Sequence, residues 1–251
     1  MEVTLLGTGA PLSPGRATTG MVVTAPGCAP LLIDTCGGFE VARQLHATGF
    51  KLADLRDVIV THRHLDHAGG MPALYLANIP LDIYATADTH AGIAAVQAGG
   101  FPEWERHREV ADHRVVPGDR REIGGFAVEF FRMEHRVETV AVRVTHGGRT
   151  LAFSADSLPC AQLIACARDA DLFICDAICA VRDGERWAQH ARTLMHSTAR
   201  EAAELATQAG AGALALVHIG RFGNPANILD EAGASFAGPV SVPDDGARYT
   251  V

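Results

Sequence analysis

The chain has 251 residues, of which 48% are hydrophobic and 20% charged, so it is long enough to form one large domain with a sizeable core. Its 21 basic and 29 acidic residues give a net charge of -8, which opposes binding along a phosphate backbone and argues against long nucleic acids as partners. No apolar run reaches the roughly 20 residues that cross a bilayer, and no basic leader with a cleavage site opens the chain, so we expect a cytoplasmic protein without a membrane partner.

Short strands separated by turns are predicted for the first quarter of the chain. A helix that ends before Gly49 is predicted at Glu40–Thr48. Apolar runs indicate strands at Val3–Leu6, Gly20–Thr24, Leu31–Asp34 and Val58–Thr61.

Directly after the last of these strands, three imidazoles and a carboxylate occur within six residues. Where a strand opens into a loop, His62 and His64 point to the same side and can bind one ion, while Asp66 and His67 face a second. Zinc takes nitrogen and oxygen ligands of this kind, and a catalytic zinc keeps one position open for water. The alternative is a solvated polar loop, but a cluster this dense predicts a metal site, with two ions rather than one.

The second half of the chain repeats the pattern of strands followed by helices. Helices are predicted at Ser157–Arg168 and Thr198–Ala209, and Gly147-Gly148 marks a hairpin turn. Strands are predicted at Arg121–Ile123, Phe126–Arg132, Thr139–Thr145, Thr150–Ser154, Leu172–Asp176 and Leu214–Val217. Because no linker interrupts this pattern, we predict one α/β domain over residues 1–251, with two packed sheets and helices on both outer faces.

Three further candidate ligands, His135, Asp156 and His218, follow predicted strands, and strand ends are where loops carry function. The expected ligands form two groups that share a bridging carboxylate: His62, His64 and His135; Asp66, His67 and His218; and Asp156 between them. Two ions about 3.5 to 4 Å apart can share a water molecule and lower its pKa, so hydrolysis is the expected chemistry. We expect two zinc ions, although manganese or iron could occupy the same ligands.

The H-x-H-x-D-H motif at a strand end resembles the signature of the metallo-β-lactamase superfamily, and in particular its branch of ribonuclease Z and arylsulfatase-like phosphodiesterases. Four further stretches carry the resemblance along nearly the whole chain: Leu6-Gly7-Thr8-Gly9 with Pro11 and Arg16; Phe153-Ser154-Ala155-Asp156-Ser157 through Ala170-Asp171-Leu172; Met195-His196-Ser197-Thr198-Ala199; and Leu216-Val217-His218 with Arg221. The resemblance implies a four-layer αββα sandwich and a homodimer.

The resemblance also implies a general acid, because His196 matches the histidine of the family's His-Ser-Thr motif. It would protonate the leaving oxygen, whereas the alternative is a histidine that merely precedes a helix cap. Where the family has His-Glu-Ala-Thr, this chain has Cys175-Asp176-Ala177-Ile178. Asp176 is therefore the expected partner of His196, with a side chain one methylene shorter than the family's glutamate.

Two departures from the family argue against transfer RNA as the substrate. Transfer-RNA-processing members carry a long arm between the third histidine and the bridging aspartate, whereas only 20 residues separate His135 from Asp156 here. The closing motif is also one residue shorter and lacks a serine, since it reads Val217-His218-Ile219-Gly220-Arg221-Phe222. Together with the acidic balance, these departures predict a small-molecule substrate.

Two residues are candidates for substrate contact. Arg221 could present its planar guanidinium to a phosphate or sulfate oxygen, and Trp187, in a stretch that we predict to be a loop, could cover the pocket. A surface ion pair for Arg221 and ordinary packing for Trp187 are the alternatives. Arg136 is a weaker candidate, for which a surface ion pair is the favoured interpretation. The six cysteines include no C-x-x-C pair and are interpreted as small apolar residues rather than a disulfide framework.

We therefore expect a dinuclear zinc hydrolase that cleaves a small phosphodiester, or a related ester such as an aryl sulfate, by attack of a metal-bound hydroxide. Asp66 would orient or deprotonate the water, and His196 would protonate the leaving group. The alternative is a carboxylic ester, lactone or β-lactam hydrolase that uses the same site. A di-iron redox protein is disfavoured because such members typically carry glutamate in place of the second histidine, and a non-catalytic module because no ligand position is lost.

Overall fold

Two seven-stranded sheets form the framework of the computed structural model, which describes residues 1–251. The first sheet has the order β14-β1-β2-β3-β4-β5-β6, and the second has the order β13-β12-β11-β10-β9-β8-β7. The strands of the first sheet are β1 (Glu2–Gly7), β2 (Gly20–Thr24), β3 (Leu31–Thr35), β4 (Asp57–Ile59), β5 (Leu81–Ala85), β6 (Val110–Arg114) and β14 (Arg248–Thr250). Those of the second are β7 (Arg120–Ile123), β8 (Phe126–Arg132), β9 (Val140–His146), β10 (Arg149–Phe153), β11 (Leu172–Asp176), β12 (Leu214–Val217) and β13 (Val240–Ser241).

Helices cover the outer face of each sheet. The first sheet carries α1 (Glu40–Thr48), α2 (Leu65–Ala68), α3 (Met71–Leu76) and α4 (Ala87–Gly100), with the 3₁₀ turn η1 (Leu52–Asp54). The second carries α5 (Ala161–Ala167), α6 (Glu185–Leu194), α7 (Ala199–Ala209) and α8 (Pro225–Gly233), with η2 (Val181–Asp183). None of these helices has the length and apolar character that a membrane span requires. The cytoplasmic location expected from the sequence stays a prediction.

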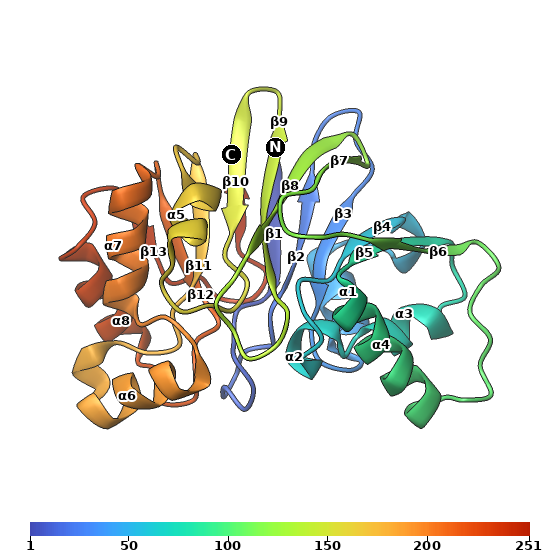
Figure 1. Cartoon of the computed structure of the whole chain (residues 1–251), viewed down its shortest axis with the longest axis horizontal. Helices are drawn as coiled ribbons and strands as arrows, with labels where there is room; N and C mark the ends of the chain where they lie inside the picture. Colours follow the sequence, from blue (N-terminus) through green and yellow to red (C-terminus); the bar gives the residue numbers. More distant parts are fainter.

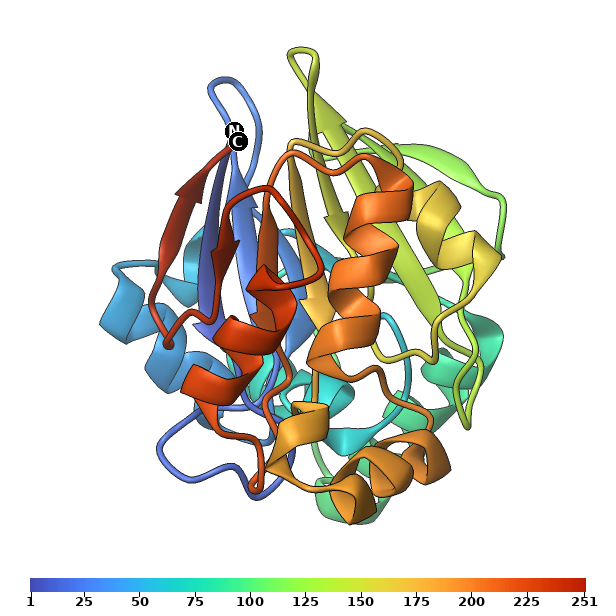
Figure 2. The ribbon, with the colours of Figure 1, turned by 90° about the vertical axis from the view of Figure 1, so that its left-hand side faces the viewer.

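The layers follow the order helix, sheet, sheet, helix, as Figure 1 and Figure 2 show from two sides. Between the sheets lies a core that includes the fully buried side chains Leu5, Ile33, Phe126 and Phe153. This arrangement confirms the predicted four-layer αββα sandwich. The two ends of the chain lie together, because β1 pairs with β14 and the Met1 amino group donates to the Val251 carbonyl oxygen at 3.2 Å.

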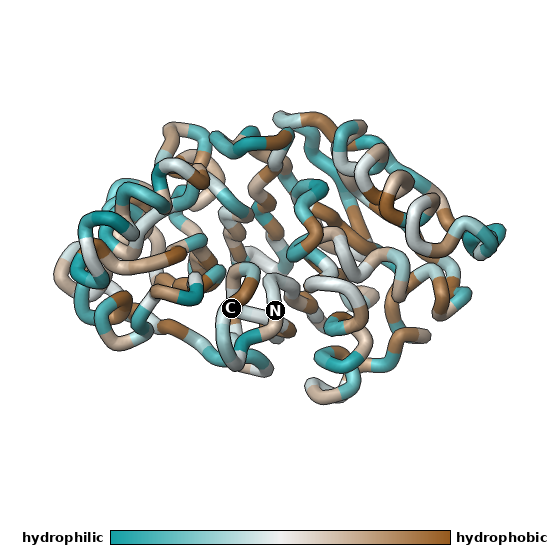
Figure 3. Tube along the Cα trace, turned by 90° about the horizontal axis from the view of Figure 1, so that it is seen from below, coloured by the Kyte–Doolittle hydropathy of each residue, from teal (hydrophilic) through white to brown (hydrophobic).

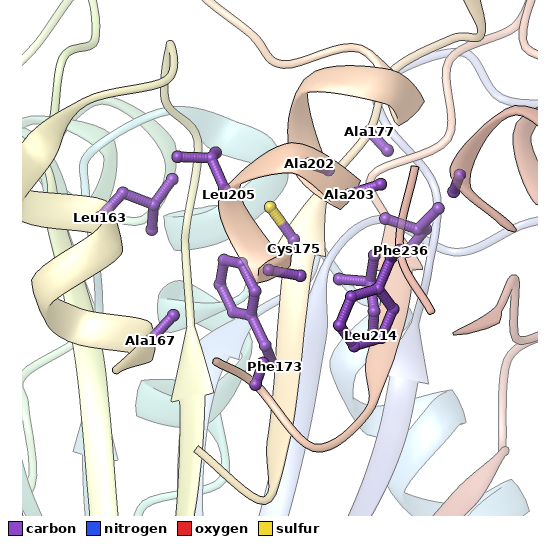
Figure 4. Close-up of a cluster of buried hydrophobic side chains, with 14 of the residues drawn as sticks. Leu163, Ala167, Phe173, Cys175, Ala177, Ala202, Ala203, Leu205, Leu214 and Phe236 are labelled. Carbon is purple, nitrogen blue, oxygen red and sulfur yellow. The ribbon is translucent and has the colours of Figure 1, made fainter. Parts of the chain in front are cut away.

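Each outer face has its own hydrophobic core. Over the second sheet, α7 buries a row of alanines and one leucine against Phe173, Cys175 and Leu214 (Figure 4). Small side chains on the helix allow it to approach the strands closely. Thr198 starts α7 in a reciprocal capping box with Glu201, which satisfies backbone donors of the first turn. Figure 3 shows the resulting hydropathy pattern, with hydrophobic stretches along the central strands and mixed character on the outer helices.

The predicted strands and the helices α1 and α7 occur close to their expected bounds, and Gly49 ends α1 in the left-handed conformation. Two bounds differ for physical reasons. Strand β4 stops at Ile59, because the Thr61 amide donates to the Asp34 side chain at 2.8 Å instead of to a neighbouring strand. Helix α5 begins at Ala161 rather than Ser157, because Leu158 is extended: it bridges to Glu134 and precedes Pro159.

The prediction of a loop around Trp187 is wrong. Residues Glu185–Leu194 form α6, an amphipathic helix that begins after Gly184, whose φ of 131° breaks the preceding turn. The aromatic side chain suggested a loop, whereas the surrounding run of good helix formers decides the backbone. Trp187 is therefore held on a helix beside the site.

All six cysteines are free, in line with the expectation from their spacing. Cys36, Cys166, Cys175 and Cys179 are buried, and burial raises the pKa of Cys179 to about 12. These four thiols therefore pack as small apolar groups.

Candidate metal centre

The carboxyl ends of five strands meet at the edge of the sandwich that carries α2 and α6 in Figure 1. The His62–His67 segment follows β4, and β8, β10, β11 and β12 lead to or end in the other chemistry-bearing residues: His135, Asp156, Asp176 and His218. Because neighbouring strands end at this edge, residues up to about 150 positions apart in sequence become neighbours in space. The structure thus brings all the expected ligands into one cluster.

The first group joins three imidazoles. His62 Nε2 and His135 Nε2 each lie 3.1 Å from the same atom, His64 Nδ1. The Asp156 carboxylate is adjacent, with Oδ2 3.5 Å from His62 Nε2 and 3.7 Å from His135 Nε2. Each of these four residues offers one nitrogen or oxygen atom that could bind a metal ion, and these four atoms all lie within 4.8 Å of one another.

The second group joins Asp66, His67, His218 and the same Asp156. His218 Nε2 lies 3.1 Å from Asp66 Oδ2, and His67 Nε2 lies 3.4 Å from that oxygen. Asp156 Oδ1 is 3.2 Å from His67 Nε2, and its Oδ2 is 3.6 Å from His218 Nε2. Asp156 therefore belongs to both groups, which is the arrangement predicted for a bridging carboxylate.

Asp34 fixes the orientation of one histidine in each group. Thr61 donates its hydroxyl proton to Asp34 Oδ2 at 2.9 Å, so its oxygen is left to accept a hydrogen bond from His62 Nδ1 at 3.1 Å. His67 Nδ1 donates directly to Asp34 Oδ2 at 2.7 Å. In both imidazoles these contacts hold a proton on Nδ1, so Nε2 is the atom that faces the cluster and would bind a metal.

The nitrogen and oxygen atoms of the cluster cannot all be satisfied by hydrogen bonds to one another, but divalent cations would satisfy them. His135 Nδ1 donates to the Met195 carbonyl oxygen at 3.1 Å, so His135 Nε2, like His62 Nε2, is an acceptor. Both acceptors face His64 Nδ1, which can offer at most one proton between them. His67 Nε2 and Asp156 Oδ1 are buried with no hydrogen-bond partner. A cation in each group would satisfy these atoms, since imidazole and carboxylate are ordinary ligands of zinc and similar metals.

The two groups differ in charge. Burial lowers the pKa of His62 and brings those of His64 and His135 to about 4, so the three imidazoles of the first group are neutral. In the second group burial opposes charge, but the Asp156 carboxylate raises the pKa of His67 well above its usual value and, with Asp176, that of His218 to about 10. Protonated imidazoles thus balance the carboxylates where metal cations would otherwise do so.

Asp176 reaches His196 in spite of its short side chain. His196 Nδ1 donates to Asp176 Oδ2 at 2.9 Å, and the amides of Ser197 and Ser157 lie 3.4 and 3.5 Å from the same oxygen. The shorter carboxylate suffices because β11 ends beneath the histidine, and Asp176 is only 1% exposed. His196 Nε2 is left as the atom that can hold or release a proton.

A cavity of about 450 Å³ opens beside the cluster and includes His196 in its wall. Arg221 and Trp187, the two candidates for substrate contact, both line it. Arg136 also lines it but donates to the Thr193 carbonyl oxygen at 2.5 Å, and so caps the C-terminal end of α6. The remaining walls are largely apolar and include Ala10, Pro11, Leu12, Leu65, Ile178, Leu194 and Phe222.

Comparison with known proteins decides the family. A family model described as the beta-lactamase superfamily domain matches residues 30–219. The chain belongs to the metallo-β-lactamase superfamily. Ribonuclease Z of Haloarcula marismortui is 32% identical over 311 aligned positions, which cover 100% of this chain and 97% of that protein. The recognition from the motifs, including the ribonuclease Z-like branch, is confirmed.

Two further proteins are similar to this chain over almost its whole length. An uncharacterized protein of Mycobacterium tuberculosis, Rv1339, is 28% identical over 253 residues, covering 96% of this chain and 88% of its own. The metallo-β-lactamase fold protein YhfI from Bacillus subtilis superposes with a TM-score of 0.84 at 25% identity, covering 99% of each chain. This superfamily member is accordingly a metal-dependent hydrolase.

Several residues in or next to the metal-type cluster have a strained backbone conformation. Asp34, Ala155, Met195 and His218 all have positive φ, between 51° and 65°, although none is a glycine. Each lies in the site or next to one of its residues. Non-glycine residues adopt this conformation only where surrounding contacts enforce it, and such positions cluster at functional sites. The tight turns at these strand ends aim the side chains at one another.

Asp34 is a residue of the site that the sequence does not single out, because in the sequence it only ends a predicted strand; in the structure it contacts Thr61 and His67. An acidic residue closing the apolar run Leu31–Ile33 was the available signal. We expect Asp34→Asn to weaken zinc binding about 10- to 100-fold, because the amide NH2 must face a donor, either the Thr61 amide or the Thr61 hydroxyl and His67 Nδ1. Chelator competition would measure this, with Asp230→Asn on the exposed face of α8 as control. Unchanged zinc affinity would contradict the assignment.

Binding of zinc to the two groups of the cluster is expected to release about two protons near neutral pH. His67 and His218 are protonated in the metal-free protein because their pKa values are raised, and each must lose a proton to offer a lone pair. Affinity should therefore rise with pH between pH 6 and 8. Calorimetry in buffers of different ionisation enthalpy counts the protons, and a count of zero would show that the second group does not bind metal.

Proposed function

We propose that the chain hydrolyses a small phosphodiester, or a related ester such as an aryl sulfate, at a centre of two zinc ions. The observation that carries the proposal is the sharing of Asp156 by two groups of metal-type donors, with the His196–Asp176 pair beside them. A paired centre suits displacement at phosphorus or sulfur, where both the attacking and the leaving oxygen need stabilisation.

The residues of the two groups would hold the ions: His62, His64 and His135 in the first, Asp66, His67 and His218 in the second, and Asp156 in both. When bound, zinc ions supply Lewis-acid chemistry, in that they polarise ester oxygens and lower the pKa of water. Manganese or iron would fit the same donors.

The chain's own residues would orient water and move protons. The Asp66 carboxylate would orient the attacking water by accepting a hydrogen bond from it. Although Asp66 is buried, His67 and His218 hold its pKa well below the usual range, which keeps the carboxylate ionised but makes it a weak base for taking the proton. His196 would donate the proton on Nε2 to the leaving oxygen. Asp176 would hold that imidazole in place by accepting a hydrogen bond from Nδ1.

Two observations favour a small substrate. The residues between His135 and Asp156 are occupied by β9, Gly147-Gly148 and β10, which leaves no room for a long arm. The Haloarcula marismortui relative has about 60 aligned positions without a counterpart here, because the alignment spans 311 positions and this chain has 251 residues. The name of that relative, ribonuclease Z, supports RNA cleavage as a second candidate.

A matched set of chromogenic substrates tests the proposal. Zinc-loaded protein would be given bis(p-nitrophenyl) phosphate, p-nitrophenyl sulfate, p-nitrophenyl acetate, a lactone and a β-lactam, with a precursor transfer RNA assayed in parallel. Leading turnover of the phosphodiester or sulfate supports the proposal. Leading turnover of the acetate, lactone or β-lactam supports the alternative of carbonyl chemistry, and RNA cleavage supports the second candidate. The homodimer implied by the resemblance stays a separate prediction for light scattering.

A further inference from the structure

Four side chains beside the cavity form a continuous stack, in which two aromatic rings lie between two guanidinium groups. The Arg186 guanidinium lies 4.1 Å from the centre of the Trp187 ring, and the Phe222 ring stacks on Trp187 with centroids 3.5 Å apart and planes 16° apart. The Arg221 guanidinium lies 4.4 Å from the centre of the Phe222 ring. The stack joins α6 to the loop after β12.

The aromatic rings in this stack have no free face. Two groups that lie within about 4.5 Å of one ring centre cannot share a face, so Arg186 and Phe222 cover opposite faces of Trp187. By the same reasoning, Trp187 and Arg221 cover opposite faces of Phe222. Trp187 therefore lines the cavity with its edge and cannot stack on a substrate ring.

The guanidinium of Arg221 leaves its N–H donors free, unlike that of Arg136, the other arginine that lines the cavity. Arg136 uses a donor on the Thr193 carbonyl oxygen, whereas the exposed Arg221 side chain makes no hydrogen bond and no ion pair with any residue. A cation–π contact uses the charge of the guanidinium but none of its N–H groups. All five donors of Arg221 thus remain available beside the cavity that it lines.

We propose that Arg221 makes the site selective for anionic substrates, and that Trp187 and Phe222 are positioning residues that hold its guanidinium at the cavity mouth. The substrate class is then an ester that carries a negative charge near the bond to be cleaved, such as a monoanionic diester. The inference deepens the proposed function and rests on it only in placing the substrate in this cavity. A flexible side chain fixed in advance loses less conformational entropy when it binds an anion.

The test separates binding from turnover. Calorimetry on zinc-loaded protein would compare methyl phenylphosphonate, a monoanion, with dimethyl phenylphosphonate, its neutral ester. We expect Arg221→Ala to weaken binding of the monoanion about 10- to 100-fold, the scale of a hydrogen bond to a charged group, and to leave the neutral ester within about twofold. Phe222→Leu and Trp187→Leu should weaken the monoanion several-fold with the same selectivity, and Phe222→Tyr should restore wild-type binding.

Arg186→Ala is the matched control, because it removes the same charge from the far end of the same stack and Arg186 does not line the cavity. It should change binding of the monoanion by less than about twofold. Equal losses for Arg186→Ala and Arg221→Ala, or equal losses for the anionic and neutral ligands, would overturn the proposal. An absence of phosphodiester turnover with this binding pattern intact would overturn the proposed function but not the inference.

Discussion

Asp156→Ala should abolish turnover and reduce bound zinc below two ions per chain. The Asp156 carboxylate is 2% exposed and lies 3.2 to 3.7 Å from imidazole nitrogen atoms of four histidines: His62, His67, His135 and His218. No other side chain of the cluster belongs to both metal groups. Its removal takes a negative charge from each group at once. We expect turnover to fall about 10³-fold or more, the scale seen when one member of a catalytic unit is deleted.

Elemental analysis after gel filtration would give the zinc content of the Asp156→Ala protein. Asp156→Asn keeps the volume and one oxygen, so it should retain more zinc than Asp156→Ala but still lose most activity. Asp230→Asn, which changes an exposed carboxylate on α8, should match the wild type in both measurements. A variant that keeps two ions and more than about a tenth of the activity would show that Asp156 is not the shared ligand.

His196→Ala is expected to slow hydrolysis most for substrates with a basic leaving group, which must be protonated as it departs. For a phosphodiester with an alkyl leaving group, loss of the general acid should cost about 10² to 10⁴ in rate. For a p-nitrophenyl ester the cost should be less than about tenfold, because p-nitrophenolate leaves as a stable anion. The geometry supports this role, since Asp176 holds Nδ1 at 2.9 Å and leaves Nε2 free.

Rates across a series of aryl and alkyl phosphodiesters would reveal this dependence on the leaving group. Asp176→Asn should show the same trend with a smaller amplitude, because His196 remains but loses its anionic partner. Zinc content must be measured beside it, since Asp176 Oδ1 also lies 3.6 Å from His218 Nδ1. A loss that is uniform across all leaving groups would instead assign His196 to binding or to the structure of the site.

The fold class and the expected ligands were within reach of the sequence for local reasons. Apolar runs of four to seven residues followed by polar side chains mark strand ends, and the His62–His67 segment concentrates its donors in six positions. The element that the sequence predicts wrongly, α6, has a less distinct local pattern than the strands. The aromatic residue of α6 favours the wrong prediction of a loop, although the backbone follows from the helix-forming residues around it.

The candidate metal ligands could be identified from the sequence alone, because His and Asp side chains at strand ends form a pattern that few other structures require. How these side chains meet in space depends on the packing of the whole chain. The reach of Asp176 to His196 depends on the ends of two elements 20 residues apart, and the role of Asp34 depends on a strand that lies beside β4. Likewise, the covered faces of Trp187 follow from the packing of α6 on a distant loop. Such relations depend on how strands order themselves in a sheet, which no local run of residues encodes.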